Sequence, residues 1–429
     1  MHTLRATNLK GWYELYRENC PVCGHRGGCM IHEKGHRVVC IRKTSDRPFS
    51  KNSALPSWLH FLNNGHVVDT KGVEHHTSEE KRKPMGLHQV YQTWLNHLVL
   101  EDNHFDHLTS DKRQLLPEQI SARGYRSMPD KPWHSVKKVQ DELRTDTLKG
   151  VPGFYHHQAK THTFWNVIQN DGILIPFRNE RNLITGFQIR KDNVQYEAVL
   201  QRGSTNKNLK AEIVKQPNTV RVIDLDSGEI ILEDTLDINK KVLLSQEGEY
   251  YGFVSVKKEN RYWWLSSAKR KEGTSAGSPP PVHVAIPSSK LIHWKSGELL
   301  KKDVVWLSEG GLKCDIASEH VTNAYTEEEL ETIGDTFIAI PGVGSWRIAL
   351  PILERMGVKR VNLAFDADAM TNQFVRMHLI QCAQELASKG IELYFAVWKQ
   401  ADGNGIDDLF LQQKKPFLKA MQYDNTGKH

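Results

Sequence analysis

The stretch that decides the fold is DVVWLSEGGLKCDIASEH, residues 303–320, in which an apolar run ends in an acid and two glycines before a helical pattern begins. The same order of apolar run, turn and helical pattern returns in residues 336–357, 361–389 and 391–413. Strands that alternate with helices in this way predict a mainly parallel sheet with helices on both faces. We therefore predict an α/β domain over residues 302–429.

Acidic residues follow several of these predicted strands. Glu309 ends the first strand, and Asp366 and Asp368 end the third. Asp407 and Asp408 follow the fourth strand after a short loop. Because the carboxyl ends of parallel strands meet at one edge of a sheet, we expect these side chains to lie together. Grouped carboxylates repel one another unless divalent cations neutralise them, and such oxygen ligands suit Mg²⁺ or Mn²⁺ bound to phosphates.

Two glycines, Gly310 and Gly311, follow the first of these acids. We predict that they leave space for a close approach of substrate or metal. The alternative for any single acid is an ordinary charge at the N-terminus of a helix, which the helix dipole favours. Three acidic strand ends in one domain favour a shared site over that alternative.

Four of the six cysteines fall in the stretch CPVCGHRGGCMIHEKGHRVVC, residues 20–40. Four soft ligands from two short knuckles suit tetrahedral Zn²⁺, so we predict a zinc site made by Cys20, Cys23, Cys29 and Cys40. The segment is too polar to form a core of buried thiols, which argues against a purely apolar role. An alternative remains in which one of the three histidines of the stretch replaces Cys29, namely His25, His32 or His36.

Basic and aromatic side chains surround the cysteines. Cations that meet phosphates and rings that stack on unpaired bases are typical of single-strand binding surfaces. We therefore predict contact with single-stranded DNA, with an ordinary solvated basic surface as the alternative. The residues concerned are Arg26, Arg37, Arg42, Lys43, Arg47, Lys51, Phe49 and Trp58.

Composition places the chain among soluble globular proteins of two or three domains, with 429 residues, 39% hydrophobic and 25% charged. No apolar run approaches the length of a membrane span. The first 20 residues lack the apolar stretch and cleavage site of a signal peptide, so we expect a cytosolic location, where cysteines are more often metal ligands than disulfide partners. No phosphate-binding loop of the GxxxxGK[ST] type occurs, which argues against a helicase motor.

Charge is distributed unevenly along the chain. Residues 1–60 hold ten Lys or Arg against four Asp or Glu, whereas residues 303–410 hold eight against seventeen. With a net charge of +6, the middle of the chain must be basic as well. A basic front and middle joined to an acidic end suits phosphate binding ahead of a metal site, and ordinary solvated faces are the alternative.

The rest of the chain divides by composition. Residues 64–85 are polar and broken by glycine and proline, as in a linker. A helical pattern begins at Gly86, and residues 172–190 read as a β-hairpin. We predict a zinc ribbon, a linker, a mixed α+β basic domain with a β-rich insertion, and the α/β domain, over residues 1–63, 64–85, 86–301 (insertion at about 192–256) and 302–429.

The acidic motifs of the C-terminal domain carry a family resemblance. Glu309-Gly310, the DxD of Asp366 and Asp368, and the later GIDD of residues 405–408 together resemble the TOPRIM domain. Bacterial-type primases share that fold with topoisomerases, some nucleases and recombination-mediator zinc proteins. Together with the cysteine pattern and the hairpin, the chain resembles bacterial replicative primases and primase-like replication proteins of phages and mobile elements.

The resemblance implies template-directed synthesis of short primers on single-stranded DNA, in which a 3′-hydroxyl attacks the α-phosphate of an incoming NTP. Asp366 and Asp368, with Asp407 or Asp408, would hold Mg²⁺ or Mn²⁺, and Glu309 would complete the metal shell or act as general base. The partners implied are single-stranded DNA, NTPs and a separate replicative helicase. Candidate ligands for template or triphosphate are Arg190, Arg261, Lys269, Arg270 and Lys313.

Three other functions compete with this interpretation. A TOPRIM nuclease would use the same metals to hydrolyse a phosphodiester, but it needs neither the zinc ribbon nor the hairpin. A non-catalytic DNA-binding replication or recombination factor would keep the fold without the chemistry. A topoisomerase would need a nucleophilic tyrosine on a large additional domain, and little of this chain is left to supply one.

Overall fold

The computed structural model describes residues 4–7, 9, 11–50, 57–63, 65, 66, 68, 70, 79–203, 207–246, 248–277, 279–367 and 373–421. The chain divides into two compact units. One contains Met1–Gln188 and Trp264–His429, and the other contains Ile189–Trp263. It is a mixed α/β protein with a cysteine cluster near its N-terminus.

The N-terminal part is a six-stranded antiparallel sheet in the order β1-β2-β3-β4-β6-β5. Its strands are β1 (Arg5–Ala6), β2 (Trp12–Glu14), β3 (Met30–His32), β4 (Arg37–Cys40), β5 (Pro48–Ser50) and β6 (Ser57–Phe61). Cys40 is the last residue of β4. The small core beneath the sheet includes three of the cysteines, together with Leu15, Ile31 and Val38.

The middle of the first unit combines helices with short strands. Its helices are α1 (Pro84–Asn96), α2 (Asp102–Thr109), α3 (Pro117–Arg123) and α4 (Pro132–Leu143). One sheet has the order β18-β11-β10-β7, and β8 and β9 pair separately. These strands are β7 (Arg126–Ser127), β8 (Phe154–Gln158), β9 (Thr163–Val167), β10 (Gly172–Arg178), β11 (Ile184–Lys191) and β18 (Tyr262–Trp264).

Helix α1 forms where the apolar spacing predicts it. Val90 and Trp94 lie on its buried face, and Trp94 makes edge-to-face contacts with Phe154 and Phe187. The end of the predicted linker is fixed rather than free, because the Lys81 ammonium donates to the carbonyls of Ala276 and Pro279 at 2.8 Å each. The predicted hairpin consists of the neighbouring strands β10 and β11.

The C-terminal sheet has six strands in the order β19-β21-β20-β22-β23-β24, and its inner pairs are parallel as expected. The edge strands β19 and β24 run antiparallel to their neighbours. Sequence analysis did not anticipate these two, which are only three and four residues long. The strands are β19 (His283–Ala285), β20 (Val304–Glu309), β21 (Phe337–Ile340), β22 (Arg360–Leu363), β23 (Glu392–Val397) and β24 (Phe417–Ala420).

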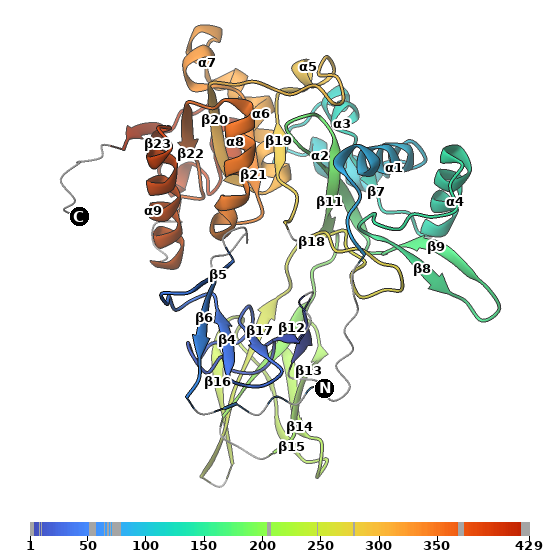
Figure 1. Ribbon diagram of the computed structural model, residues 1–429, viewed down its shortest axis with the longest axis vertical. Helices are drawn as coiled ribbons and strands as arrows, with labels where there is room; N and C mark the ends of the chain where they lie inside the picture. Colours follow the sequence, from blue (N-terminus) through green and yellow to red (C-terminus); the bar gives the residue numbers. More distant parts are fainter. Residues whose placement is uncertain are drawn as a thin grey trace. The chain divides into compact units, whose positions relative to one another are not determined.

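Helices cover both faces of this sheet (Figure 1). Val305 and Leu307 of β20 face α8 and α9, whereas Trp306 faces α6 and α10. A strand buried on both faces explains the unbroken apolar run of β20. The predicted helix 347–357 starts late, since a 3₁₀ turn precedes Pro351. The helical segments are α5 (Ser288–Leu291), α6 (Gly311–Ala324), α7 (Glu327–Ile333), η1 (Val343–Ile348), α8 (Leu350–Met356), α9 (Gln373–Ser388), η3 (Gln400–Asp402) and α10 (Ile406–Leu411).

The second unit consists of two three-stranded antiparallel sheets, β12-β17-β16 and β13-β14-β15. Strand β12 packs beside β13 and β15 packs beside β16, so the two sheets close on a common apolar core that includes Val220, Leu244 and Val254. The strands are β12 (Tyr196–Arg202), β13 (Leu209–Lys215), β14 (Thr219–Asp224), β15 (Ile230–Thr235), β16 (Lys241–Gln246) and β17 (Glu249–Lys258). In the described part of the chain, no helix has the length and apolarity needed to span a membrane.

Candidate functional site

The first candidate acid lies where a parallel strand becomes a helix. Glu309 is the last residue of β20, and α6 begins two residues later. Between them, Gly310 has φ +81°, a left-handed conformation that a side chain would strain, and a Cβ there would touch the aliphatic part of Lys313 at 3.8 Å. Gly311 differs from the prediction, because a Cβ there would lie 2.7 Å from the Phe177 ring. This glycine lets α6 pack against β10 and leaves no room for substrate.

The centre of the carboxylate site is Lys313, on the first turn of α6. Its Nζ donates to Asp366 Oδ1 at 2.6 Å. Burial alone would lower the pKa of Lys313, but the charge and hydrogen bond of Asp366 outweigh it, helped by Asp407 and Glu309, and raise that pKa. Three of the predicted acids therefore act on one ammonium group.

Asp407 is the most deeply buried acid of the site, with 1% of its surface exposed. Burial, reinforced by the charge of Asp408, raises the pKa of Asp407 to about 6, although Lys313 and Arg113 pull it down. Its Oδ2 lies 3.3 Å from Arg113 Nη1. Its Oδ1 is buried and has no hydrogen-bond partner among the described residues. A side chain at Gly405 would collide with that oxygen, which gives the glycine of GIDD its physical reason.

Asp408 has a different role from its neighbour. Its Oδ2 accepts hydrogen bonds from the backbone amides of Asn404 (3.2 Å) and Gly405 (3.1 Å), so it caps the N-terminus of α10. Asn404 in turn donates from Nδ2 to Asp366 Oδ2 at 3.0 Å. The two adjacent acids therefore differ: one Asp408 oxygen is engaged by the backbone, whereas Asp407 Oδ1 has no hydrogen-bond partner among the described residues.

The acids approach one another less closely than a filled metal site requires. Among the described residues, the only group of three or more potential ligands within 4.8 Å of one another is the cysteine cluster. Asp368 lies outside the described residues. Arg113 and Asn404 were not predicted to contribute. Asn404 stands directly before the GIDD motif, whereas Arg113 belongs to no recognisable pattern in the sequence.

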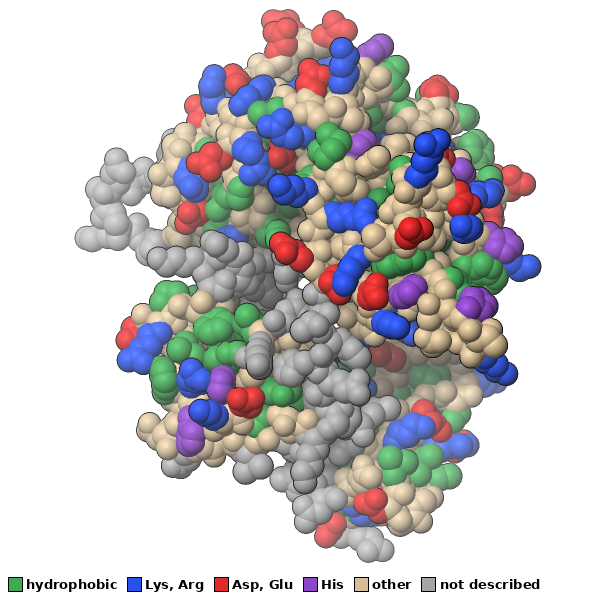
Figure 2. Space-filling model, turned by 45° about the vertical axis from the view of Figure 1, so that its right-hand side comes forward, with side chains coloured by type: hydrophobic (Ala, Val, Ile, Leu, Met, Phe, Trp, Pro, Cys, Tyr) green, Lys and Arg blue, Asp and Glu red, His purple; other side chains and the backbone are tan. Residues whose placement is uncertain are grey.

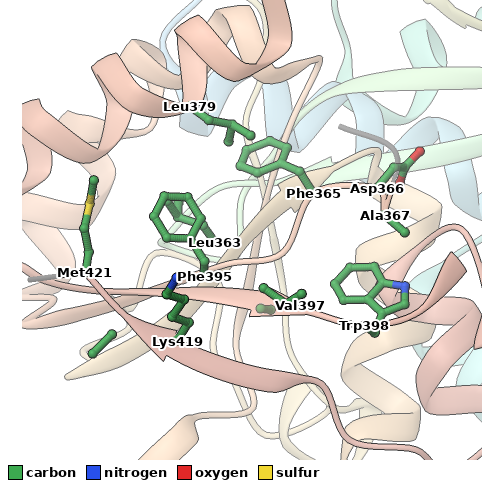
Figure 3. Close-up of a pocket in the computed structure, with 12 residues that line it drawn as sticks. Leu363, Phe365, Asp366, Ala367, Leu379, Phe395, Val397, Trp398, Lys419 and Met421 are labelled. Atoms are coloured by element: carbon green, nitrogen blue, oxygen red, sulfur yellow. The ribbon is translucent and has the colours of Figure 1, made fainter. Parts of the chain in front are cut away.

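An apolar pocket of about 780 Å³ adjoins Asp366 (Figure 3). Phe365 and Leu379 lie on one side of the pocket and Lys419 and Met421 on the opposite side, while the Asp366 carboxylate points away from it. The remaining lining residues are Leu363, Ala367, Phe395, Ala396, Val397, Trp398 and Ala420. Asp366 therefore stands between this apolar cavity and Lys313.

A buried ionic network holds α6, and with it Lys313, against the preceding helices. Arg123 of α3 pairs with both Asp315 and Glu319 of α6. Asp315 also accepts hydrogen bonds from the Tyr125 hydroxyl at 2.6 Å and from His283 Nε2 at 2.9 Å. His283 Nδ1 must accept the Arg178 backbone amide at 2.9 Å, so the imidazole is neutral and carries its proton on Nε2.

The four predicted cysteines come together near the N-terminus. All four thiols lie within 4.8 Å of one another, with Cys29 Sγ 3.8 Å from both Cys23 Sγ and Cys40 Sγ. Ligands at 2.3 Å around a tetrahedral zinc ion would be separated by about 3.8 Å, so the cluster fits Zn²⁺. The backbone amides of Arg42 and Lys43 donate to Cys40 Sγ at 3.4 and 3.2 Å, which stabilises a thiolate there.

The histidine alternative is excluded within the described cluster, which contains only cysteines. His25 Nδ1 lies 2.7 Å from the Cys23 carbonyl, and His32 packs edge-to-face on Trp12. A hydrogen bond between the two thiols lowers the pKa of Cys20 and raises the pKa of Cys29.

Some of the predicted basic residues around the cysteines already make contacts within the protein. Arg42 donates from Nη1 to the Gly27 carbonyl at 2.9 Å, and Arg26 donates to Asn19 Oδ1 at 3.0 Å. Arg47 lies over the exposed Phe61 ring, 4.9 Å from its centroid. The other members are placed as follows: Arg37 over Trp12, Phe49 against Trp12, Trp58 in β6, Lys43 exposed, and Lys51 outside the described residues.

The other predicted phosphate ligands lie in two places. Arg190 and Arg261 belong to the second unit, where the Lys191 amide donates to the Arg261 carbonyl. Lys269 and Arg270 are exposed on a turn fastened to β8 by Ser267, and the Arg270 guanidinium lies 5.4 Å from the Tyr155 ring centroid. On the face shown in Figure 2, basic and acidic side chains of the described residues intermingle, so no single basic patch marks a nucleic-acid path there.

Comparison with known proteins gives one family match, described as "Domain of unknown function (DUF3854)", over residues 301–416. No curated protein matches the sequence. Among solved structures, the chain is similar to the zinc-binding and RNA polymerase domains of the Aquifex aeolicus primase, with 11% identity, a TM-score of 0.39, and coverage of 96% of this chain and 81% of that chain.

Two further solved structures are similar to this chain. The E. coli primase catalytic core has 10% identity and a TM-score of 0.36, with 77% of each chain covered. The RNA polymerase domain of the Mycobacterium tuberculosis primase has 12% identity and a TM-score of 0.39, with 77% of this chain and 80% of that chain covered. Structural similarity at this level does not establish a function.

Proposed function

We propose that the chain is a primase-like nucleotidyltransferase that joins nucleotides on a single-stranded DNA template. In this proposal residues 302–429 form a TOPRIM catalytic domain, residues 1–63 form a zinc ribbon, and residues 86–301 form a template-binding domain. The observation that carries the proposal is the set of carboxylates around Lys313, at the carboxyl ends of parallel strands. Open α/β sheets bind phosphate-containing ligands at this edge.

Each group of the site has a distinct role in the proposed reaction. The Lys313 ammonium would neutralise phosphate oxygens as negative charge develops on the leaving pyrophosphate. Glu309, at the open end of β20, would accept the proton of the attacking 3′-hydroxyl or complete a metal shell. Asn404 and Lys313 hold the two oxygens of Asp366 from opposite sides and so fix its orientation.

The carboxylate oxygens of the site are the kind of donor that a divalent cation prefers, and a bound ion would draw them closer together. Asp407 Oδ1 is a buried carboxylate oxygen without a hydrogen-bond partner in the described structure, which is the kind of atom that a hard cation satisfies. Asp366 and Asp407, with Glu309 and Asp368, would hold Mg²⁺ or Mn²⁺. When bound, the metal supplies charge stabilisation for phosphoryl transfer. The raised pKa of Asp407, about 6, predicts that such binding releases a proton at pH values of about 6 and below.

The test is primer synthesis on single-stranded DNA with labelled NTPs, in Mg²⁺ and separately in Mn²⁺, by the wild type and by Asp366→Asn. The asparagine keeps the shape of the side chain and removes its charge. Asp303→Asn is the matched control, because Asp303 is an exposed acid of the same domain, paired only at the surface with Lys359. Short products from the wild type and the control, but not from Asp366→Asn, are expected. Equal products from all three enzymes would refute the assignment of the site.

A further inference from the structure

The second unit has an exposed sheet face that its own fold does not use. Pairing across the sheet places Gln201 of β12 and Leu243 of β16 on either side of Phe253 of β17. Alternate residues of β17, such as Val254 and Val256, point to the core instead. We call the outward side the barrel face, and define it by Gln201, Lys241, Leu243, Tyr250, Phe253 and Lys257.

Large apolar groups on the barrel face remain in contact with water. Leu243 is 53% exposed and Tyr250 is 45% exposed. The Tyr250 ring packs edge-to-face on Phe253, with centroids 5.8 Å apart, which confirms that both rings lie on the same side of β17. The exposed Tyr250 ring and the half-buried Phe253 ring are inclined at 70° to each other, so each offers a separate aromatic surface on which another planar group can stack.

A lysine side chain, Lys241, lies beside the Phe253 ring. Lys241 Nζ lies 5.9 Å from the Phe253 centroid and is held there by a 3.0 Å hydrogen bond to Gln201 Oε1. Among the described residues, the second unit contains four lysine–aromatic contacts, and Lys241–Phe253 is the one that involves a ring of the barrel face. The other three are Lys191–Trp263, Lys207–Tyr251 and Lys258–Tyr196.

From this combination we propose that the barrel face is a binding site for single-stranded DNA, in which bases stack on Phe253 and Tyr250 while Lys241 and Lys257 contact phosphates. Rings in a sheet with lysines at their edges match the alternation of bases and phosphates along an unpaired strand. Small closed β-sheets bind oligonucleotides on such a face. The inference rests on the proposed function for the identity of the strand, which would be the template.

A protein partner fits this face less well. Interface cores exclude lysine because its ammonium is costly to desolvate, yet Lys241 Nζ lies only 5.9 Å from the centroid of the Phe253 ring. Phosphates would satisfy that ammonium without burying it. Glu197 lies opposite Lys257 in the β12–β17 register, so the basic character is concentrated at the Lys241 end of the face. We therefore place the phosphate contact that matters most at Lys241.

Binding is measured with the full chain in an Asp366→Asn background, so that loss of catalysis and loss of binding are separated. The probe is a fluorescein-labelled single strand of about 16 thymidines, long enough for one small barrel. Replacing both rings (Tyr250→Leu with Phe253→Leu) should weaken binding about a hundredfold, because each of the two stacked bases contributes about tenfold. The matched control is Ile230→Ala. Ile230 is 52% exposed, compared with 45% for Tyr250, but it belongs to β15 in the sheet β13-β14-β15.

Two readouts distinguish stacking on this face from a general loss of folding. Lys241→Gln should reduce the slope of log affinity against log salt by about 0.7, the value for one lost phosphate contact to a single strand. A photoreactive 5-iodouracil strand should crosslink to the tryptic peptide of residues 242–257, which contains both rings. Crosslinks confined to residues outside 189–263, or a ring variant that binds like the Ile230→Ala control, would overturn the inference.

Discussion

The Lys313 ammonium lies 2.6 Å from Asp366 Oδ1, in the space between carboxylates where a metal-dependent enzyme would hold a cation. The contact joins the first turn of α6 to the loop after β22. Since Asp407 and Glu309 also act on this ammonium, Lys313 balances the carboxylate charge in the absence of metal, together with Arg113 beside Asp407. A divalent ion that enters must share the carboxylates with it.

Lys313→Ala should therefore tighten metal binding while it impairs the reaction. Without the ammonium, Asp366 and Asp407 present unbalanced charge, so Mn²⁺ affinity should rise by about threefold to tenfold. Nucleotide incorporation should fall by at least about tenfold, because the triphosphate loses a cation. Mn²⁺ binding followed by electron paramagnetic resonance and incorporation of labelled NTP measure the two effects. Lys313→Arg, which keeps the charge, is the control, and weaker Mn²⁺ binding by Lys313→Ala would contradict this role.

Asp407 should make the free energy of unfolding of the metal-free protein depend on pH. Its pKa of about 6 lies above the ordinary value near 4, so the folded state holds the proton more tightly than the unfolded state. The cost of burying the charge is fully present above pH 6 and disappears as the pH falls towards 4. Asp407→Asn should thus stabilise the protein by about 2–3 kcal/mol at pH 8 and by little at pH 4.

Thermal melting of the wild type and of Asp407→Asn, at several pH values in buffers free of added divalent ions, measures this difference in stability. Added Mg²⁺ should stabilise the wild type and have little effect on Asp407→Asn, because the ion replaces the proton only on the carboxylate. A gap in melting temperature that widens as the pH falls would have the wrong sign for a buried acid and would count against the assignment.

Arg123 should be far more important for stability than surface cations. Its removal in Arg123→Met leaves Asp315 and Glu319 buried without a counter-charge, which typically costs about 3–5 kcal/mol. Lys359→Ala is the control, since its pair with Asp303 is exposed on both sides and should contribute about 0–1 kcal/mol. Denaturant unfolding followed by tryptophan fluorescence compares the two. Equal effects would show that the network does not hold α6.

The cysteine cluster predicts one zinc ion per chain, held by four thiolates. Elemental analysis of the purified protein should find that ion, and Cys29→Ser should lower the zinc content and the stability of residues 1–63. Cobalt substitution offers a direct readout, because tetrahedral four-sulfur coordination gives a strong visible absorption. A spectrum typical of mixed nitrogen and sulfur ligands would instead assign a histidine to the site.

Local sequence pattern was sufficient for the elements that carry the site. The parallel strands β20 and β22 follow from apolar runs, and the position of Glu309 follows from the end of one of them. The cysteine cluster follows from spacing alone. These features depend on residues close together in the chain, which is where pattern has predictive value.

What sequence reasoning missed depends on contacts between distant residues. Arg113 reaches Asp407 across 294 positions, and the ring that fills the space beside Gly311 belongs to Phe177. The different roles of Asp407 and Asp408 can be predicted only if the first residue of α10 is known. The residue at the third helical position, Asp408, forms the capping box. The edge strands β19 and β24 are too short to show a period.

The most direct test of the central claim is to identify the product chemically. The wild type is incubated with an unlabelled single-stranded DNA, NTPs and Mn²⁺, and the nucleic acids are analysed by mass spectrometry while pyrophosphate is quantified. The account predicts new short strands that carry a 5′-triphosphate, one pyrophosphate for each bond formed, and neither product from Asp366→Asn. Shortened template without new strands would identify a nuclease, and an intact template without pyrophosphate would leave only a binding protein. Either result would contradict the proposed synthesis.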